Sequence, residues 1–184
     1  MNTISVEYGD SRIRVQLPLP CDELGMGAVA PLADPAAAIR AALEAPLGRP
    51  PLRQLARQKA ASGGRAVIVV SDKTRPVPYR GKTGILAPTL RTLVDAGFPR
   101  ERITVLIGNG SHRSMSPPEI EAMLGLAEAG WEVAVENHVY DREEALVLVG
   151  RTGRGSPVKI NRLYAEASLK IVTGLVESHF MAGA

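Results

Sequence analysis

Two polar segments of the sequence hold the side chains best suited to chemistry. The first is Ser-Asp-Lys-Thr-Arg-Pro-Val-Pro at residues 71–78, in which Asp72 and Arg75 are three residues apart. A guanidinium binds a carboxylate or phosphate through two parallel hydrogen bonds, so Arg75 is suited to holding an anion. Asp72 is suited to orienting a hydroxyl, a cation or Arg75 itself. An Asp–Arg pair that only fixes the loop explains the same spacing equally well.

The second segment is Gly-Asn-Gly-Ser-His-Arg at residues 108–113. Its glycines permit left-handed backbone and close approach, so successive N–H groups can form an anion-binding nest with His112 beside it. An imidazole with an ordinary pKa of about 6.5 exchanges a proton at neutral pH, which suits His112 to acid/base chemistry. A glycine turn with a surface histidine is the simpler interpretation. The segment lacks the Lys-Ser/Thr ending of a Walker loop.

The remaining candidates lie further along the chain. His179 is followed by Phe180 and Met181 and could bind a metal through a neutral ring nitrogen. Three separated histidines without a cysteine pair do not make a metal site from protein ligands alone. His138 is interpreted as an exposed loop residue. Four basic residues suit a phosphate, although a solvated surface is the ordinary explanation for them: Arg151, Arg154, Lys159 and Arg162.

Predicted buried strands precede these segments. Continuous aliphatic runs predict strands at Ala66–Val70, Ile103–Ile107, Val133–Val135, Leu146–Val149 and Leu169–Thr173. Apolar residues at helical spacing predict helices between them, at 84–96, 116–124 and 161–167. This alternation predicts an α/β fold, a mostly parallel sheet with flanking helices in a Rossmann-like three-layer arrangement. Such sheets bind ligands beyond the carboxyl ends of their strands, so we expect four loops to meet at one edge, namely 71–78, 108–113, 150–157 and 174–179.

The N-terminal part is predicted to form a β-hairpin followed by two helices. Alternating apolar residues on both sides of Gly9-Asp10 predict the hairpin, over residues 4–17. The helices are expected at 36–45, with Asp34 as N-cap, and at 52–61. We expect residues 1–50 to belong to the same domain as the α/β region at 51–184.

Composition excludes several classes of protein. The 184 residues are 45% apolar and 22% charged, which suffices for one core and is too apolar for a disordered chain. A net charge of +3 with one Trp, four Tyr and two Phe gives no reason to expect a nucleic-acid partner. No apolar run is long enough for a bilayer and no secretory signal is recognisable, so we expect no membrane partner and a cytoplasmic location. Cys21 is the only cysteine, which excludes an intramolecular disulfide.

The sequence resembles the lactate racemase family, whose members use a nickel-pincer nucleotide cofactor. Four motifs stand in the order expected of that family, the two segments described above together with Gly-Ser-Pro-Val-Lys-Ile-Asn-Arg at 155–162 and Gly-Leu-Val-Glu-Ser-His-Phe-Met-Ala-Gly at 174–183. The family continues into a second domain. A histidine-bearing loop directly after a buried strand is also where an α/β domain builds its site, so we expect a truncated sequence whose C-terminal domain is missing.

The resemblance implies particular roles for individual residues. His179 matches the histidine that binds nickel, His112 matches one of two acid/base histidines, and Arg75 and Asp72 match residues of the substrate pocket, with Arg75 suited to the substrate carboxylate. The implied cofactor-binding residues are Thr74, Gly110, Ser111, Arg154, Arg162 and His179. The implied chemistry is transient transfer of the C2 hydride of a 2-hydroxy acid to the cofactor, giving a planar ketoacid that regains the hydride on either face.

Two departures from the family pattern limit what carries over. Arg154 stands in the region where lactate racemase has its second catalytic histidine, and Arg162 stands where a lysine tethers the cofactor. An arginine does not readily form that amide-type link, so we expect cofactor binding without a covalent tether. The missing histidine favours a 2-hydroxy acid other than lactate, or an epimerisation that uses another acid/base group.

The sequence thus predicts the N-terminal, cofactor-binding part of a racemase or epimerase that acts on a hydroxy acid. The family site lies between two domains, so we expect this part to be inactive alone and its exposed half-site to favour self-association into a homo-oligomer. The alternative is a non-catalytic anion- or nucleotide-binding α/β domain. A pure interaction module is a third interpretation, and its mark would be a large exposed apolar patch.

Overall fold

The structure is a computed structural model that describes residues 2–20, 22, 27, 29–177 and 181. The chain divides into two compact units, residues 1–33 and residues 34–184. In the first unit, β1 (Asn2–Tyr8) pairs antiparallel with β2 (Ser11–Leu17). Gly9, the first residue of the two-residue turn, has a φ of +58°, as a type II′ turn requires. The predicted hairpin is confirmed.

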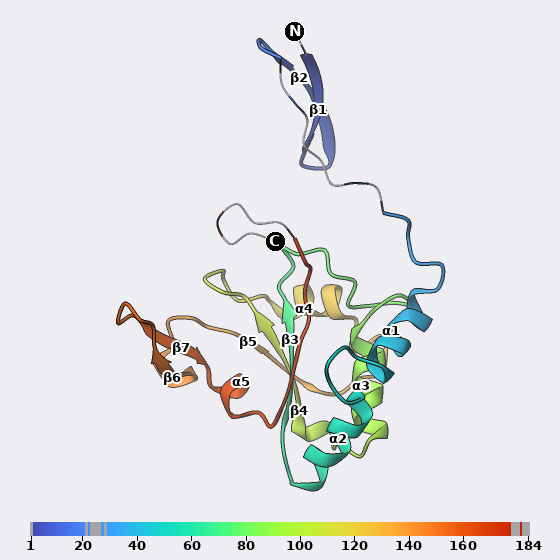
Figure 1. The fold of residues 1–184 in the computed structure, drawn as a ribbon, viewed down its shortest axis with the longest axis vertical. Coiled ribbons are helices and arrows are strands. Elements are labelled where there is room, and N and C mark those ends of the chain that lie inside the picture. Colours follow the sequence, from blue (N-terminus) through green and yellow to red (C-terminus); the bar gives the residue numbers. More distant parts are fainter. Residues whose placement is uncertain (1, 21, 23–26, 28, 178–180, 182–184) are drawn as a thin grey trace. The chain divides into compact units, whose positions relative to one another are not determined.

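The second unit is built on a four-stranded parallel sheet with the strand order β5-β4-β3-β8 (Figure 1). Its strands are β3 (Ala66–Ser71), β4 (Ile103–Gly108), β5 (Ala134–Asn137) and β8 (Leu169–Val172). Ser71 lies opposite Gly108, so the central strands β3 and β4 end side by side. The loops that follow these two strands therefore begin at the same point of the sheet edge.

Helices cover the two faces of this sheet unequally. The helices are α1 (Pro35–Glu44), α2 (Leu52–Ala61), α3 (Leu86–Asp95), α4 (Pro117–Leu124) and α5 (Arg162–Glu166). Figure 1 shows α1, α2 and α3 on one side of the sheet and the short α5 on the other. None of the helices in the described part of the chain is long and apolar enough to cross a membrane. The predicted α/β class with flanking helices is confirmed.

The pleat of the strands divides the apolar side chains between two clusters. The larger cluster joins Ile68 and Val70 of β3 and Val105 of β4 to helical residues such as Leu90 and Leu93, all fully buried. Residues of β3 and β4 that point to the other face form the smaller one, together with Tyr164 of α5 and Ala167 at the end of that helix. Each buried aliphatic side chain stabilises the fold by about 1.5–3 kcal/mol, so the first cluster dominates.

The predicted strand at Leu146–Val149 does not belong to the main sheet. Residues Leu146–Arg151 form β6, which pairs antiparallel with β7 (Pro157–Asn161) in a separate hairpin. Leu148 and Val149 are each 54% exposed, whereas the central strands β3 and β4 of the main sheet are mostly buried. A short apolar run cannot distinguish these two environments, because the run has the same pattern in both. The expectation that four loops share one sheet edge is therefore wrong for residues 150–157, which form the end of β6, the hairpin turn and the start of β7.

A buried tyrosine ties the loop after β3 to the sheet. The hydroxyl of Tyr79 accepts a hydrogen bond from the Ser71 backbone N–H at 2.6 Å and lies 3.1 Å from the Thr173 hydroxyl. Thr173 in turn donates to the Val69 carbonyl at 2.8 Å. Tyr79 is 1% exposed, so its hydroxyl joins the ends of β3 and β8 away from water. This bond fixes the residue directly before Asp72.

We predict that Tyr79→Phe lowers the free energy of unfolding by about 1–3 kcal/mol, because the Ser71 N–H loses its partner in a partly buried position. Urea unfolding followed by circular dichroism measures the change. Tyr140→Phe is the matched control, since Tyr140 is 54% exposed. Its effect should stay within about 0.5 kcal/mol, and equal effects of the two variants would contradict the role of the Tyr79 hydroxyl.

Candidate active site

The loops after β3 and β4 bring Asp72 and His112 into direct contact. Asp72 is the first residue after β3, and His112 lies four residues beyond the end of β4. The Nδ1 atom of His112 lies 2.5 Å from the Oδ2 atom of Asp72. The pair forms because the register of the parallel strands places Ser71 beside Gly108. Two residues forty apart in sequence thus form one hydrogen-bonded pair.

Asp72 is held as a buried carboxylate. Its Oδ1 atom accepts hydrogen bonds from the Thr74 backbone N–H at 3.1 Å and from the Thr74 hydroxyl at 2.5 Å. Burial alone raises the pKa of Asp72, but the hydrogen bonds from Thr74 and His112 outweigh it and leave this pKa below its ordinary value. An ionised Asp72 holds the Nδ1–H of His112, so the Nε2 atom of His112 is the one that can accept a proton.

The turn that carries His112 presents free backbone donors. The His112 N–H bonds the Asn109 carbonyl at 2.9 Å, and Gly110 adopts a φ of +57° that a side chain would disfavour. Within the described residues, the N–H groups of Gly110 and Ser111 have no hydrogen-bond partner. Asn109 is 2% exposed and anchors the turn by donating to the Arg113 carbonyl at 3.1 Å. The arrangement has the features of the predicted anion nest.

Arg75 opens onto the same hollow as His112. The hollow has a volume of about 350 Å³ and is lined by Ser71, Asp72, Thr74, Arg75, Gly108, Asn109, Gly110, Ser111 and His112. Arg75 does not pair with Asp72. Its Nε atom lies 3.6 Å from Glu177, and both side chains are more than half exposed. An exposed ion pair of this kind is weak, so the Arg75 guanidinium can exchange Glu177 for another anion.

Glu119 clamps the two loops from outside the hollow. It accepts hydrogen bonds from both guanidinium nitrogens of Arg113, at 2.6 and 2.9 Å, and it also pairs with Lys73. Donation from Arg113, then from Lys73, holds the pKa of Glu119 far below its usual range. Lys73 follows Asp72 and Arg113 follows His112, so Glu119 links the chain neighbours of both members of the pair.

Sequence reasoning did not single out Glu119, although its position could have been recognised. Ser116 and Glu119 form a capping box at the start of α4, in which the Ser116 N–H donates to Glu119 at 2.9 Å. A Ser-Pro-Pro-Glu sequence predicts that motif, since a glutamate three residues after the N-cap bonds back to it. The further pairing with Lys73 and Arg113 depends on the fold, so spacing could not reveal it.

The other predicted site residues lie elsewhere or outside the described residues. Arg154 lies in the β6–β7 turn, and Arg162 donates to the Glu144 and Leu146 carbonyls at 3.1 Å. Neither lines the hollow beside His112. His179 falls outside the described residues. His138 is half-buried rather than exposed, and its Nδ1 atom lies 3.2 Å from the amide nitrogen of Asn161.

Comparison with known proteins places the chain in a family. The model of the lactate racemase N-terminal domain matches residues 8–184. The chain belongs to this family. It is 36% identical over 145 residues to the lactate racemase of Lactiplantibacillus plantarum, covering 79% of the chain and 32% of that relative. It is 32% identical over 195 residues to the lactate racemase of Thermoanaerobacterium thermosaccharolyticum, covering the whole chain and 42% of that relative.

The fold agrees with this family. The lactate racemase apoprotein of Thermoanaerobacterium thermosaccharolyticum superimposes with a TM-score of 0.74 at 30% identity, over 97% of this chain and 40% of that one. The chain spans between about a third and two fifths of the length of the curated lactate racemases that it matches. The resemblance expected from the four motifs is confirmed. The roles of individual residues remain predictions.

We predict that Asp72→Asn lowers the free energy of unfolding by about 1.5–3 kcal/mol at pH 6, because charge-assisted hydrogen bonds to a buried carboxylate are lost. The pKa of Asp72 is lower in the folded than in the unfolded chain. The difference between wild type and variant should therefore be full above about pH 5 and shrink below about pH 4, as acid protonates the wild-type carboxylate. Urea unfolding at several pH values measures it. Asp141→Asn, at an exposed residue, is the control, and a gap that widens in acid would contradict the assignment.

We predict that Glu119→Gln loosens the Asp72–His112 pair without unfolding the chain, because both supporting ion pairs are lost together. Proton NMR should show the far-downfield resonance of the shared Nδ1 proton in the wild type and a broadened or missing one in the variant. Glu121→Gln is the matched control, since Glu121 accepts from the Ala127 and Glu128 N–H groups instead. An unchanged resonance in Glu119→Gln would show that the clamp does not position His112.

Proposed function

We propose that the chain is the N-terminal, cofactor-binding part of an enzyme that racemises or epimerises a 2-hydroxy acid. The observation that carries the proposal is the contact between Asp72 and His112 in a hollow that Arg75 also lines, in a chain of the lactate racemase family. An imidazole oriented by a buried carboxylate is a general base, and a guanidinium beside it is a carboxylate-binding group. A 2-hydroxy acid requires both groups.

In this proposal His112 moves the proton of the substrate hydroxyl. Asp72 occupies Nδ1, so Nε2 accepts the proton as the C2–H bond breaks and returns it when that bond re-forms. Thr74 donates hydrogen bonds to the other carboxylate oxygen of Asp72. The carboxylate is thereby held in place, and it in turn holds the orientation of the His112 ring. Arg75 releases Glu177 and binds the substrate carboxylate through two hydrogen bonds. Arg75 thereby sets which end of the substrate faces His112.

The described residues fit part of the nickel-pincer nucleotide. A nucleotide phosphate needs several N–H and O–H donors, and the free N–H groups of Gly110 and Ser111 line the hollow together with the Ser111 side chain. The Thr74 hydroxyl already donates to Asp72, so it is not one of these donors. The bound cofactor supplies a carbon and nickel centre that accepts a hydride. His179 is the proposed nickel ligand, and Arg154 and Arg162 remain proposed cofactor contacts. Arg162 stands where a lysine tether is expected, so binding is proposed to be non-covalent.

We predict that His112→Gln lowers kcat for racemisation by about 10²–10⁴-fold in the full-length protein, because no other described group next to Asp72 can take the hydroxyl proton. The assay follows loss of optical purity across a series of 2-hydroxy acids, with protein co-expressed with the cofactor biosynthesis enzymes. His138→Gln is the matched control, since His138 bonds Asn161 instead of Asp72. It should retain wild-type kcat.

Nickel content separates the two histidine roles in the same preparations. His112→Gln should retain nickel and His179→Ala should lose it, because only His179 is proposed as a metal ligand. Full activity of His112→Gln would overturn the acid/base assignment. Full nickel retention by His179→Ala would overturn the cofactor assignment.

A second candidate function is a non-catalytic anion- or nucleotide-binding domain. The free N–H groups of Gly110 and Ser111 beside Arg75 favour it, because they suit an anion whether or not chemistry follows. Calorimetry with nucleotides and small hydroxy acids distinguishes the two functions. Tight nucleotide binding without any nickel dependence would favour this candidate over the racemase.

A further inference from the structure

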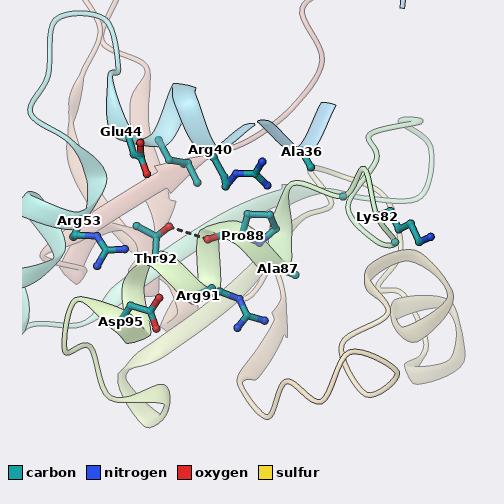
Figure 2. A pocket seen from close by; sticks show the side chains of 13 residues that line it. Ala36, Arg40, Glu44, Arg53, Lys82, Ala87, Pro88, Arg91, Thr92 and Asp95 are labelled. Atoms are coloured by element: carbon teal, nitrogen blue, oxygen red, sulfur yellow. Dashed lines mark hydrogen bonds between the residues drawn. The ribbon is translucent and has the colours of Figure 1, made fainter. Parts of the chain in front are cut away.

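A second hollow lies on the helical side of the sheet, remote in the fold from the Asp72–His112 pair. It has a volume of about 380 Å³ and lies among α1, α2, α3 and the segment that precedes α3 (Figure 2). Its apolar part comes from Ala36, Leu43, Ala87 and Pro88. It shares no lining residue with the hollow beside His112. It therefore belongs to neither the proposed racemase chemistry nor its cofactor site.

Four cationic side chains from three helices and the segment before α3 line this hollow. They are Arg40 of α1, Arg53 of α2, Arg91 of α3 and Lys82 of the segment before α3. Within the described residues, Arg40, Arg53 and Lys82 make no hydrogen bond or ion pair, and Arg91 contacts only the Trp131 ring, 6.0 Å from its centroid. Other basic residues of the same unit, such as Lys73 and Arg113, are paired. Cationic side chains that line one hollow without partners repel one another, so an anion bound there would be stabilised.

The acidic residues of the hollow do not neutralise all of these cations. Figure 2 shows Glu44 and Asp95 on the same side as Arg53, whereas Arg40, Arg91 and Lys82 lie on the other side. Neither carboxylate forms an ion pair in the described part of the chain. The hollow thus has one mixed end and one end that is cationic only, and an anionic group is expected at the cationic end.

We propose that this hollow binds a phosphate monoester with a small, largely apolar organic part. A phosphate offers three oxygens to guanidinium and ammonium donors, whereas a carboxylate offers only two. A dianion also offsets the positive charge of the cationic end better than a monoanion does. The apolar surface of Ala87 and Pro88 beside the arginines then takes the organic part, and the volume falls within the range of small-molecule sites.

The single tryptophan gives a direct readout of binding. Trp131 is the only tryptophan of the sequence, and Arg91 and Arg100 both lie over its ring, at 6.0 and 5.1 Å from the centroid. Only Arg91 also lines the hollow. An anion that draws the Arg91 guanidinium toward itself changes the cation–π contact and hence the Trp131 emission.

The test titrates the 184-residue chain with phenyl phosphate, benzoate, phenol and inorganic phosphate while Trp131 emission is recorded. We expect a saturable change with phenyl phosphate, an affinity at least about tenfold lower for benzoate and for inorganic phosphate, and no change with phenol. Binding of phenol as tight as that of phenyl phosphate would overturn the proposal, as would the absence of any saturable change with phenyl phosphate.

Charge-removing variants test the residues themselves. Arg40→Gln should weaken phenyl phosphate binding by about tenfold or more, whereas Arg100→Gln should change the initial emission and leave the affinity unaltered. Arg91→Gln removes the optical signal, so its affinity is measured by calorimetry and should fall as that of Arg40→Gln does. Equal affinities of wild type and Arg40→Gln would overturn the proposal. All these positions are exposed, and thermal unfolding verifies that each variant is folded.

Discussion

The site depends on one constraint, that the carboxylate of Asp72 is buried at the end of a central strand and must be fully hydrogen-bonded there. An unpaired buried carboxylate costs several kcal/mol, so its oxygens need donors from the loops around it. Thr74 satisfies one oxygen and His112 the other. The hydrogen bond that stabilises the fold is therefore also the one that fixes the tautomer of the imidazole, so stability and the proposed acid/base function share one contact.

That contact exists only because the supporting structure holds two loops in register. The parallel pairing of β3 with β4 sets Ser71 beside Gly108, and the buried aliphatic residues of both strands keep that pairing in place. The buried Tyr79 hydroxyl holds the loop after β3 to the end of that strand, and Glu119 links this loop to the loop after β4. Neither residue lines the hollow beside His112, yet both hold loops that carry the Asp72–His112 pair.

The sequence predicts the parts of this arrangement that depend on strands buried along their whole length. The aliphatic runs before residues 71 and 108 identify central strands, and the edge rule for parallel sheets then brings Asp72, Arg75 and His112 to one place. The partner of Asp72 could not be predicted, because a spacing of three residues suggests Arg75. In the structure, the turn that bonds the Arg75 N–H to the Asp72 carbonyl leaves the carboxylate to Thr74 and His112. The strand at 146–149 was assigned to the wrong sheet for a related reason. Whether distant segments bury a strand cannot be read from a short apolar run.

The segment between Tyr79 and α3 connects the part of the chain beside Asp72 to the cationic hollow, and its backbone is closely packed. Tyr79 anchors its first residue to Ser71, beside Asp72, while Lys82 lines the cationic hollow. Gly84 lies so close to the Tyr79 carbonyl that a Cβ atom there would come within 2.5 Å of it, so only glycine fits. The Ile85 N–H then bonds the Pro78 carbonyl at 2.9 Å and closes the segment into a compact loop. Hydrogen bonds between Tyr79 and Ser71 and between Ile85 and Pro78 thus link the segment that carries Lys82 to the end of β3.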